Sequence, residues 1–215
     1  MRGQIRTVMG VTEWTLLVVL GTLWGGSYFF GKVALAQLPP FTAAVCRLGL
    51  AAVVLNAAAR AAGHRLPDSF PAWRAFWIMG LLNNVIPMSL ILWGQTRIGS
   101  GLAAILNAST PLFTVVLAHV FTLDERMTPS RAGGVLFGLA GVTVMIGPAV
   151  LGGLTRDVAA ELAVLGAAVS YACAGIFGRR FAGSPPLVTA AGQVTASTLT
   201  LLPLSLAVDR PWLLP

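Results

Sequence analysis

Charged residues are scarce in this sequence. Only 10% of its 215 residues are charged and 56% are hydrophobic, whereas soluble domains carry about 25% charged residues. A soluble fold of this length has no core large enough to bury so many apolar residues. The scarcity of charge therefore excludes a soluble globular domain and predicts a membrane protein.

Residues with catalytic or metal-binding chemistry are also few. His119 stands alone near the end of an apolar run, with no second histidine or carboxylate at metal-ligand spacing. The sequence holds no phosphate-binding glycine loop and no nucleophilic serine motif. Cys46 and Cys173 lie within apolar runs and are interpreted as free thiols that serve as small apolar residues. We therefore expect no metal, no other cofactor and no enzymatic activity.

Acidic residues are missing from the middle of every apolar run. We expect all seven to lie at the ends of spans or in loops: Glu13, Asp68, Asp124, Glu125, Asp157, Glu161 and Asp209. Proton-coupled carriers use buried carboxylates as relays. Their absence from the membrane midplane disfavours carboxylate-based coupling within this chain. If the chain is a carrier, the pattern favours a facilitator, an exchanger or a carrier that is coupled by other means.

Seven apolar runs are long enough to cross a membrane as helices, at about 1.5 Å per residue across a hydrocarbon core of about 30 Å. They predict an all-α polytopic membrane protein. The expected spans cover residues 14–36, 41–62, 72–95, 99–123, 131–150, 159–181 and 186–208.

The basic residues predict the orientation of these spans. If the N-terminus is cytoplasmic, nine of the 14 Lys and Arg residues fall on the inside and three, Arg97, Arg156 and Arg210, fall on the outside. Lys32 and Arg47 lie within spans. This asymmetry follows the positive-inside rule, and short basic loops are not the one-sided patch that nucleic acid requires. We expect a multi-pass protein in the lipid bilayer, with a cytoplasmic N-terminus and no nucleic-acid partner.

The chain contains a weak internal repeat. A shift of 147 residues places Trp24 on Tyr171, and a shift of 146 places Arg47 on Gln193. The repeat therefore restarts after five spans. Because five is odd, the second copy enters the membrane inverted, as in secondary transporters with a binding site between the repeats.

This repeat predicts two units. Residues 1–150 form a first repeat of five helices, and residues 151–215 form a partial second repeat of two helices. The prediction is that seven of ten helices are present and that three further spans belong to the natural protein. The alternative is a natural protein of seven spans.

Polar, aromatic and proline residues within the spans mark the expected substrate cavity, because a buried carboxamide without a partner costs about 2–7 kcal/mol. The predicted substrate-binding residues are Trp24, Arg47, Asn83, Asn84, Gln95, Asn107, Thr110, Tyr171 and Gln193. For the amides, interhelical hydrogen bonding is the alternative, and for the aromatic residues it is core packing. Pro87 and Pro111 are expected to kink their helices and to act as gates.

The two cations within spans have competing interpretations. Arg47 suits a substrate carboxylate, because a guanidinium forms bidentate pairs with carboxylates. Alternatively, it extends to the outer surface or satisfies carbonyl groups at a helix end. Lys32 lies near the outer end of its span and is expected to extend to the membrane surface.

Small residues recur at four-residue spacing in two spans and allow helices to approach closely. Gly134 and Gly138 lie in the fifth span, and the sixth span carries Gly166, Ser170, Ala174 and Gly178. We interpret these stripes as packing faces within the chain, with a homodimer through them as the alternative.

Several motifs together resemble the EamA-type members of the drug/metabolite transporter superfamily, over essentially the whole chain. They are residues 23–27 with Lys32, Pro40-Phe41 with Arg47-Leu48, residues 101–113, and residues 124–128 followed by Gly134, Gly138 and Gly141.

The resemblance implies ten helices in two inverted repeats around a central cavity. It further implies export of small metabolites, such as amino acids, or of toxic compounds across the bacterial inner membrane by alternating access. A nucleotide-sugar or drug carrier and a non-transporting membrane assembly subunit are the alternatives.

Overall fold

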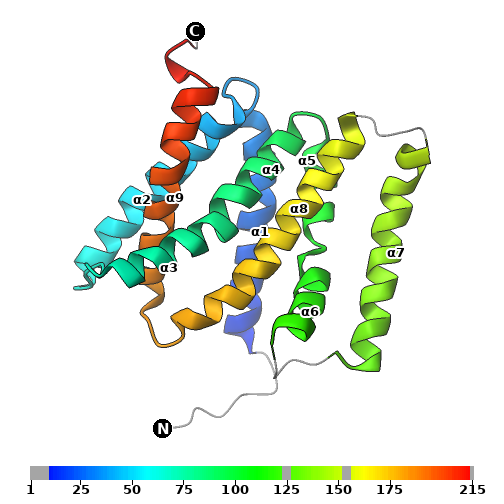
Figure 1. The fold of residues 1–215 in the computed structure, drawn as a ribbon, viewed down its shortest axis with the longest axis horizontal. Helices are drawn as coiled ribbons and strands as arrows, with labels where there is room; N and C mark the ends of the chain where they lie inside the picture. The colour runs from blue at the N-terminus through cyan, green and yellow to red at the C-terminus, as the bar shows by residue number, and fades with distance from the viewer. Residues whose placement is uncertain (1–9, 123–126, 152–155, 214–215) are drawn as a thin grey trace.

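The protein is described by a computed structural model, which covers the backbone of residues 10–122, 127–151 and 156–213 (Figure 1). The side chains of residues 145–151 and 156 lie outside this description. The described part of the chain contains helices and no strand. In order, the helices are α1 (Val11–Ala34), α2 (Pro40–Ala61), α3 (Phe70–Gly80), η1 (Leu81–Val85), α4 (Ile86–Gln95), α5 (Ser100–Asn107), α6 (Thr110–Phe121), α7 (Pro129–Leu151), α8 (Arg156–Gly178), η2 (Arg179–Phe181), α9 (Pro186–Val208) and η3 (Pro211–Leu213).

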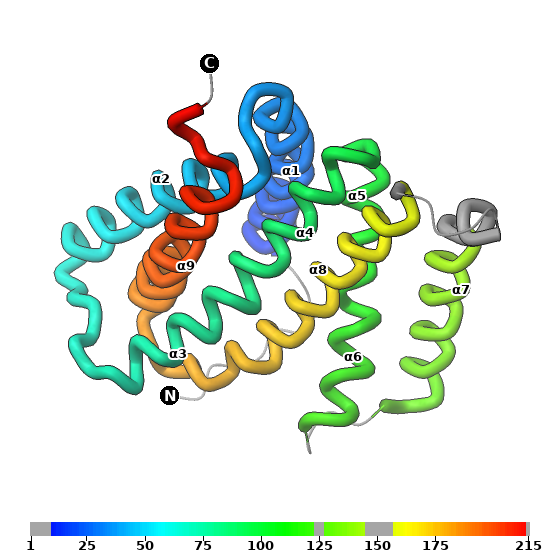
Figure 2. Tube along the Cα trace, turned by 45° about the horizontal axis from the view of Figure 1, so that its top comes forward, coloured from blue at the N-terminus to red at the C-terminus, as the bar shows by residue number. Residues whose placement is uncertain are grey.

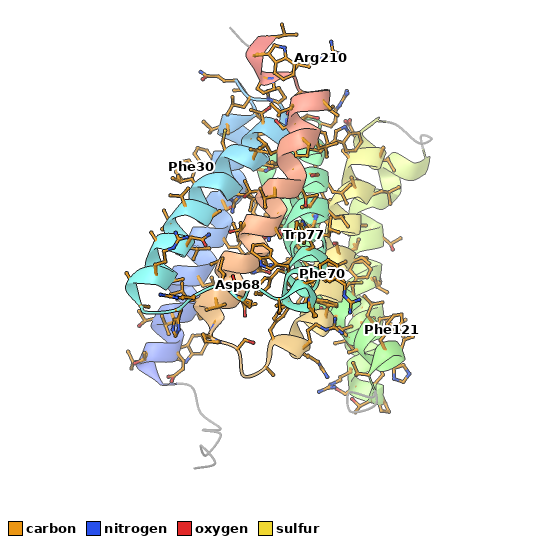
Figure 3. The ribbon with its side chains drawn as sticks, turned by 60° about the vertical axis from the view of Figure 1, so that its left-hand side comes forward. Phe30, Asp68, Phe70, Trp77, Phe121 and Arg210 are labelled. Carbon is orange, nitrogen blue, oxygen red and sulfur yellow. The ribbon has the colours of Figure 1, made fainter. Side chains whose placement is uncertain are left out.

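Six segments of the described residues are long and apolar enough to cross a membrane: α1, α2, the continuous segment from α3 to α4, the segment from α5 to α6, α8 with η2, and α9. The remaining expected span corresponds to α7, which is 23 residues long. Large apolar side chains cover the outside of the molecule, and Phe30 and Phe121 point away from the helices in Figure 3. Such a surface fits lipid, so the predicted all-α polytopic membrane fold is confirmed.

Helix α8 lies at the centre of the packing. It contacts α4, α5, α6 and α7, while α9 packs on α2 and α3 (Figure 2). Close approach is possible because a glycine faces backbone: a Cβ at Gly94 of α4 would lie 3.1 Å from the carbonyl oxygen of Ala160 in α8. The buried core around this contact includes Ile91, Leu106 and Val164.

The small-residue stripe of α8 faces α3, η1 and α4 of the same chain. The Ser170 hydroxyl donates to the carbonyl oxygen of Leu82 at 2.7 Å, and a Cβ at Gly166 or Gly178 would contact Leu90 or Met79. The stripe of α8 is therefore a packing face within the chain, which was the first of its two interpretations.

Helices α1 and α7 lie at the edge of the molecule. Helix α1 buries none of its residues and contacts mainly α4 and α5. Helix α7 contacts α6 and α8, and Gly138 of α7 packs directly against Leu112 of α6. The position of α1 matters for function because its inner face forms one wall of the cavity described below.

Two charged residues have surroundings that the sequence does not show. Glu161 lies near the start of its span, as expected, since α8 begins at Arg156, but its side chain is only 7% exposed. The Lys32 ammonium reaches the turn that follows α4. Its Nζ donates to the carbonyl oxygens of Gln95 and of Ile98, the latter at 3.2 Å, and so satisfies acceptors that the end of α4 leaves free.

Candidate substrate cavity

Two cavities meet at three aromatic residues inside the helix bundle. Trp24 and Tyr28 of α1 and Tyr171 of α8 line both of them. The larger cavity, of about 840 Å³, lies between α1, α3 with η1, α5, α6 and α8. The smaller, of about 30 Å³, extends towards Arg47 and Gln95. The Trp24 and Tyr171 rings meet edge to face, with centroids 6.4 Å apart, and form the boundary between the two cavities.

A π-helical segment turns two adjacent asparagines in different directions. Pro87 has no N–H to donate to the carbonyl of Asn83, so the α-helical ladder is interrupted just before it. The chain responds with the wider turn of η1, in which the Ile86 N–H donates to the Leu81 carbonyl. Asn83 lines the larger cavity, whereas Asn84 points to α9 and its Nδ2 donates to the Ser197 hydroxyl at 3.0 Å.

Pro111 has a stronger effect on its own span. The predicted single helix is broken into α5 and α6, with a turn at Ala108 and Ser109. The carbonyl that Pro111 leaves free belongs to Asn107, and the Thr110 hydroxyl donates to it at 2.7 Å. Neighbouring hydroxyl groups commonly replace the missing donor in such membrane helices. The expected distortion at Pro111 is therefore observed as a break in the helix, whereas the span at Pro87 continues through η1. A kink at Pro87 and a gating role for either proline stay predictions.

Asn107 carries the least satisfied polar atom of the larger cavity. Its side chain is 8% exposed, lines the cavity and faces the Tyr28 side chain. Its Oδ1 has no hydrogen-bond partner among the described residues. A buried acceptor without a partner costs about 1–3 kcal/mol, so this atom favours a ligand that brings a donor.

Arg47 supplies positive charge beside the aromatic boundary. It lines the smaller cavity together with Tyr28 and Tyr171. No described carboxylate lines either cavity. A carboxylate on a ligand is thus the partner that suits this arginine.

Gln95 has a structural role in addition to its place in the smaller cavity. It is 1% exposed, and its Nε2 donates to the backbone carbonyl of Tyr28 at 2.9 Å. Together with Lys32, which binds the Gln95 carbonyl, it joins α1 to the end of α4. This link fixes the wall that carries Trp24 and Tyr28.

The structure brings together seven of the nine predicted substrate-binding residues. Asn84 and Gln193 line neither cavity, since both lie where η1 and α3 pack on α9. Sequence reasoning missed Tyr28, although it follows Trp24 by four residues and so lies on the same face of α1. It also missed Ser27 and Thr114, for which the sequence offers no comparable signal. The seven that converge are Trp24, Arg47, Asn83, Gln95, Asn107, Thr110 and Tyr171.

A polytopic helical membrane protein with a central, partly polar cavity has the architecture of a transporter. Residues 12–147 match the model of the EamA-like transporter family. The chain belongs to this family.

Several of the relatives found by sequence are named as transporters or exporters. The uncharacterized transporter YoaV of Bacillus subtilis is 27% identical over 82% of this chain and 58% of its own length. The uncharacterized inner membrane transporter YedA of Escherichia coli K12 is 26% identical over 86% of this chain and 59% of its own. A protein of Streptantibioticus cattleyicolor named "Probable terminal-alkyne amino-acid exporter" is 31% identical over 89% of this chain and 63% of its own. The chain thus spans about three fifths of the length of these relatives.

A solved crystal structure shares the fold. It aligns with a TM-score of 0.56 over 87% of this chain and 67% of the other chain, at 24% sequence identity. At that identity, the likeness supports the helical architecture alone.

Proposed function

We propose that this protein is a secondary transporter of small metabolites such as amino acids. It acts in the bacterial inner membrane by alternating access, and export is favoured over import. The observation that carries the proposal is the pair of joined cavities, in which aromatic walls separate Arg47 from the unpartnered Oδ1 of Asn107. The family supports transport in general, and the cavity supports the substrate class.

The cavity offers each part of an amino acid a partner. The Arg47 guanidinium binds the carboxylate through paired hydrogen bonds. Trp24 and Tyr171 cover the apolar part of the molecule. The ammonium group donates to Asn107 Oδ1, which is the donor that this buried acceptor lacks. A volume of about 840 Å³ lies in the range of small-molecule sites, about 300–1,000 Å³.

The alternating-access mechanism rests on the proposed inverted repeats, of residues 1–150 and 151–215. Trp24 and Tyr171, which the 147-residue shift makes equivalent, contact each other. The next pair of equivalent helices, α2 and α9, packs antiparallel: Thr42 at the start of α2 binds Asp209 at the end of α9. Contact between equivalent elements of the two repeats is what a two-fold axis through the bundle would produce, and it supports rocking of the repeats about the cavity.

The orientation and the coupling remain part of the proposal. A cytoplasmic N-terminus places the most basic face of the chain inside. Since no described carboxylate lines either cavity, we favour a facilitator, an exchanger or a carrier whose coupling does not use a cavity carboxylate. Buried Glu161 lies outside both cavities.

A homodimer through small-residue helix faces is proposed only for the free part of α7, because the stripe of α8 is covered within the chain.

The test is substrate efflux from proteoliposomes that contain the full-length protein. Arg47→Gln should lower the transport of carboxylate-bearing amino acids roughly tenfold to a hundredfold, as expected for loss of a charged hydrogen bond. The corresponding amino amides should lose little. Arg97→Gln is the matched control, because Arg97 is exposed and lines neither cavity.

Equal loss for acids and amides would contradict the assignment of Arg47. Selective transport of nucleotide sugars or of cationic drugs would move the substrate class to those alternatives. A lack of any transport, together with stoichiometric copurification of another membrane protein, would instead support an assembly subunit.

A further inference from the structure

A further cavity lies at the end of the bundle where α3 and α9 begin. It has a volume of about 580 Å³ and shares no lining residue with the two central cavities. His64 and Arg65 reach it from the connection between α2 and α3, and Arg180 reaches it from η2. The proposed transport function uses none of these residues.

Two helix N-termini converge on this cavity. The first turn of α3 contributes Pro71 and Ala72, and the first turns of α9 contribute Val188 and Thr189. Neither helix has a side-chain cap at its N-terminus. Pro71 and Pro186 have no N–H, and the Val188 N–H donates to the Pro185 carbonyl, so the N–H groups of Ala72 in α3 and Leu187 in α9 are first-turn donors that remain for a ligand. Helix N-termini with free N–H groups attract anions, phosphate above all.

The end of α2 fixes the basic residues in place. The N–H of Gly63 donates to the Arg60 carbonyl and the N–H of His64 donates to the Ala59 carbonyl, which is the Schellman arrangement. It requires the left-handed backbone of Gly63, with φ of 76°. The chain therefore leaves α2 in a defined direction, with His64 and Arg65 directed to the cavity.

The floor of the cavity is apolar, and Arg180 lies at its side. Phe76 of α3 and Phe181 of η2 stack with centroids 5.7 Å apart and nearly parallel planes. The Arg180 guanidinium lies 4.1 Å from the centre of the Phe177 ring, a contact that orients an arginine without neutralising it. The cavity thus combines a cationic rim with an aromatic floor.

Negative charge is missing from the same place. No acidic residue of the described chain lines this cavity, and neither Arg65 nor Arg180 forms an ion pair with a described residue. Asp68 lines the adjoining cavity of about 710 Å³, where Arg60, His64 and Arg65 surround it. The positive charge at the rim is therefore left for a ligand.

We propose that this cavity binds the phosphate of an anionic phospholipid. Two arginines and two helix N-termini suit a phosphate diester, and the Phe76–Phe181 floor suits the adjoining glycerol and the first acyl carbons. The position favours a lipid over a soluble ligand: the cavity lies where two candidate membrane spans begin, and the ends of membrane spans meet the headgroup region. Basic clusters beside membrane spans attract anionic lipids in this way. The proposal does not depend on the transported substrate.

The experiment measures lipid retention by native mass spectrometry of the full-length protein, after exchange into micelles with phosphatidylglycerol or phosphatidylcholine. The protein should retain phosphatidylglycerol selectively. The Arg65→Gln, Arg180→Gln double variant should bind it roughly 30-fold more weakly, as expected for two cations near a membrane surface. The control is the double variant Arg74→Gln, Arg131→Gln, which removes two other exposed arginines. It should bind phosphatidylglycerol as the wild type does.

A further variant keeps the test valid if the double variant fails to fold. Thr189→Asp places a carboxylate in the cavity wall, and an acidic residue near a helix N-terminus favours the helix. It should therefore fold and still lose phosphatidylglycerol. Equal weakening in the Arg74 and Arg131 control would overturn the proposal in favour of diffuse surface charge. If glycerol phosphate bound as tightly as phosphatidylglycerol, the assignment of a lipid ligand would be overturned, and the cavity would be a site for a soluble phosphate ester.

Discussion

Two spans of this protein carry the same sequence signal, an amide followed by a proline, and fold differently around it. Between α3 and α4 the helix continues through the π-helical segment η1, and Asn84 is satisfied by Ser197. Between α5 and α6 the helix breaks, and Asn107 faces the cavity with a free acceptor. The comparison shows that an intramembrane amide becomes a structural joint or a binding group according to what packs against it.

The reason for the difference lies in the neighbouring helix. Helix α9 packs closely on the first span because Gly80 leaves no side chain in the way, and Ser197 is then available to Asn84. The second span packs on α8, but Asn107 faces the cavity of about 840 Å³, which Trp24, Tyr28 and Tyr171 also line.

The largest effect is expected from closing the approach of α9. A Cβ at Gly80 would lie 2.6 Å from the Ser197 hydroxyl oxygen and 2.8 Å from the Gln193 carbonyl oxygen. Gly80→Ala should therefore lower the free energy of unfolding by about 1–3 kcal/mol, the typical effect of overpacking. The measurement is thermal unfolding in detergent micelles.

The matched substitution in the other span is Gly101→Ala. No atom lies within 4 Å of a Cβ at this position, so the melting temperature should stay the same or rise slightly, given the higher helix propensity of alanine. If the two variants melted alike, the close contact at Gly80 would not be what holds α9 to this span.

The two asparagines should separate stability from transport. Asn84→Ala removes a partner of buried Ser197 and should lower the free energy of unfolding by about 1 kcal/mol, with little effect on substrate affinity. Asn107→Ala removes an acceptor that has no partner, so unfolding should change little. Its KM for amino acids should rise roughly tenfold, the equivalent of about 1.4 kcal/mol.

Unfolding curves and initial transport rates of both variants, in the same lipid, would test this assignment. Asn107→Gln serves as the control, because it keeps an acceptor at a shifted position and should recover part of the affinity. A destabilised Asn107→Ala with an unchanged KM would make Asn107 a structural residue like Asn84.

Sequence reasoning predicted the bounds of the spans better than it predicted which of their side chains face a cavity and which face a neighbouring helix. The span 186–208 was predicted at its observed bounds, because Pro186 begins α9 and Asp209 follows its last residue. The polar residues of the α5–α6 span, Asn107 and Thr110, also reached the cavity as predicted. Both results depend on local signals, proline and hydropathy, which act within one helix.

The failures depend on partners that are distant in the sequence. A π-helical turn changes the direction of the following side chains, so Asn83 and Asn84 diverge in a way that ordinary helical periodicity does not show. The carbonyl groups that bind Lys32 belong to Gln95 and Ile98, which lie 63 and 66 residues further along the chain. The burial of Glu161 has no local signal either. All of these are contacts between helices, which the sequence order does not specify.

The smallest effect on stability is expected from restoring a backbone donor at the break between α5 and α6. In Pro111→Ala the new N–H competes with the Thr110 hydroxyl for the Asn107 carbonyl. The two donors replace each other, so the free energy of unfolding should change by less than about 1 kcal/mol. A straighter α5–α6 span would nevertheless resist the bending that a gate requires. We therefore expect kcat to fall a fewfold while KM stays the same.

Pro129→Ala, at the first residue of α7, is the control for removing a proline at a helix start. If both variants transported at the wild-type rate, the break would be a fixed feature of the cavity wall, and the gate would have to lie elsewhere.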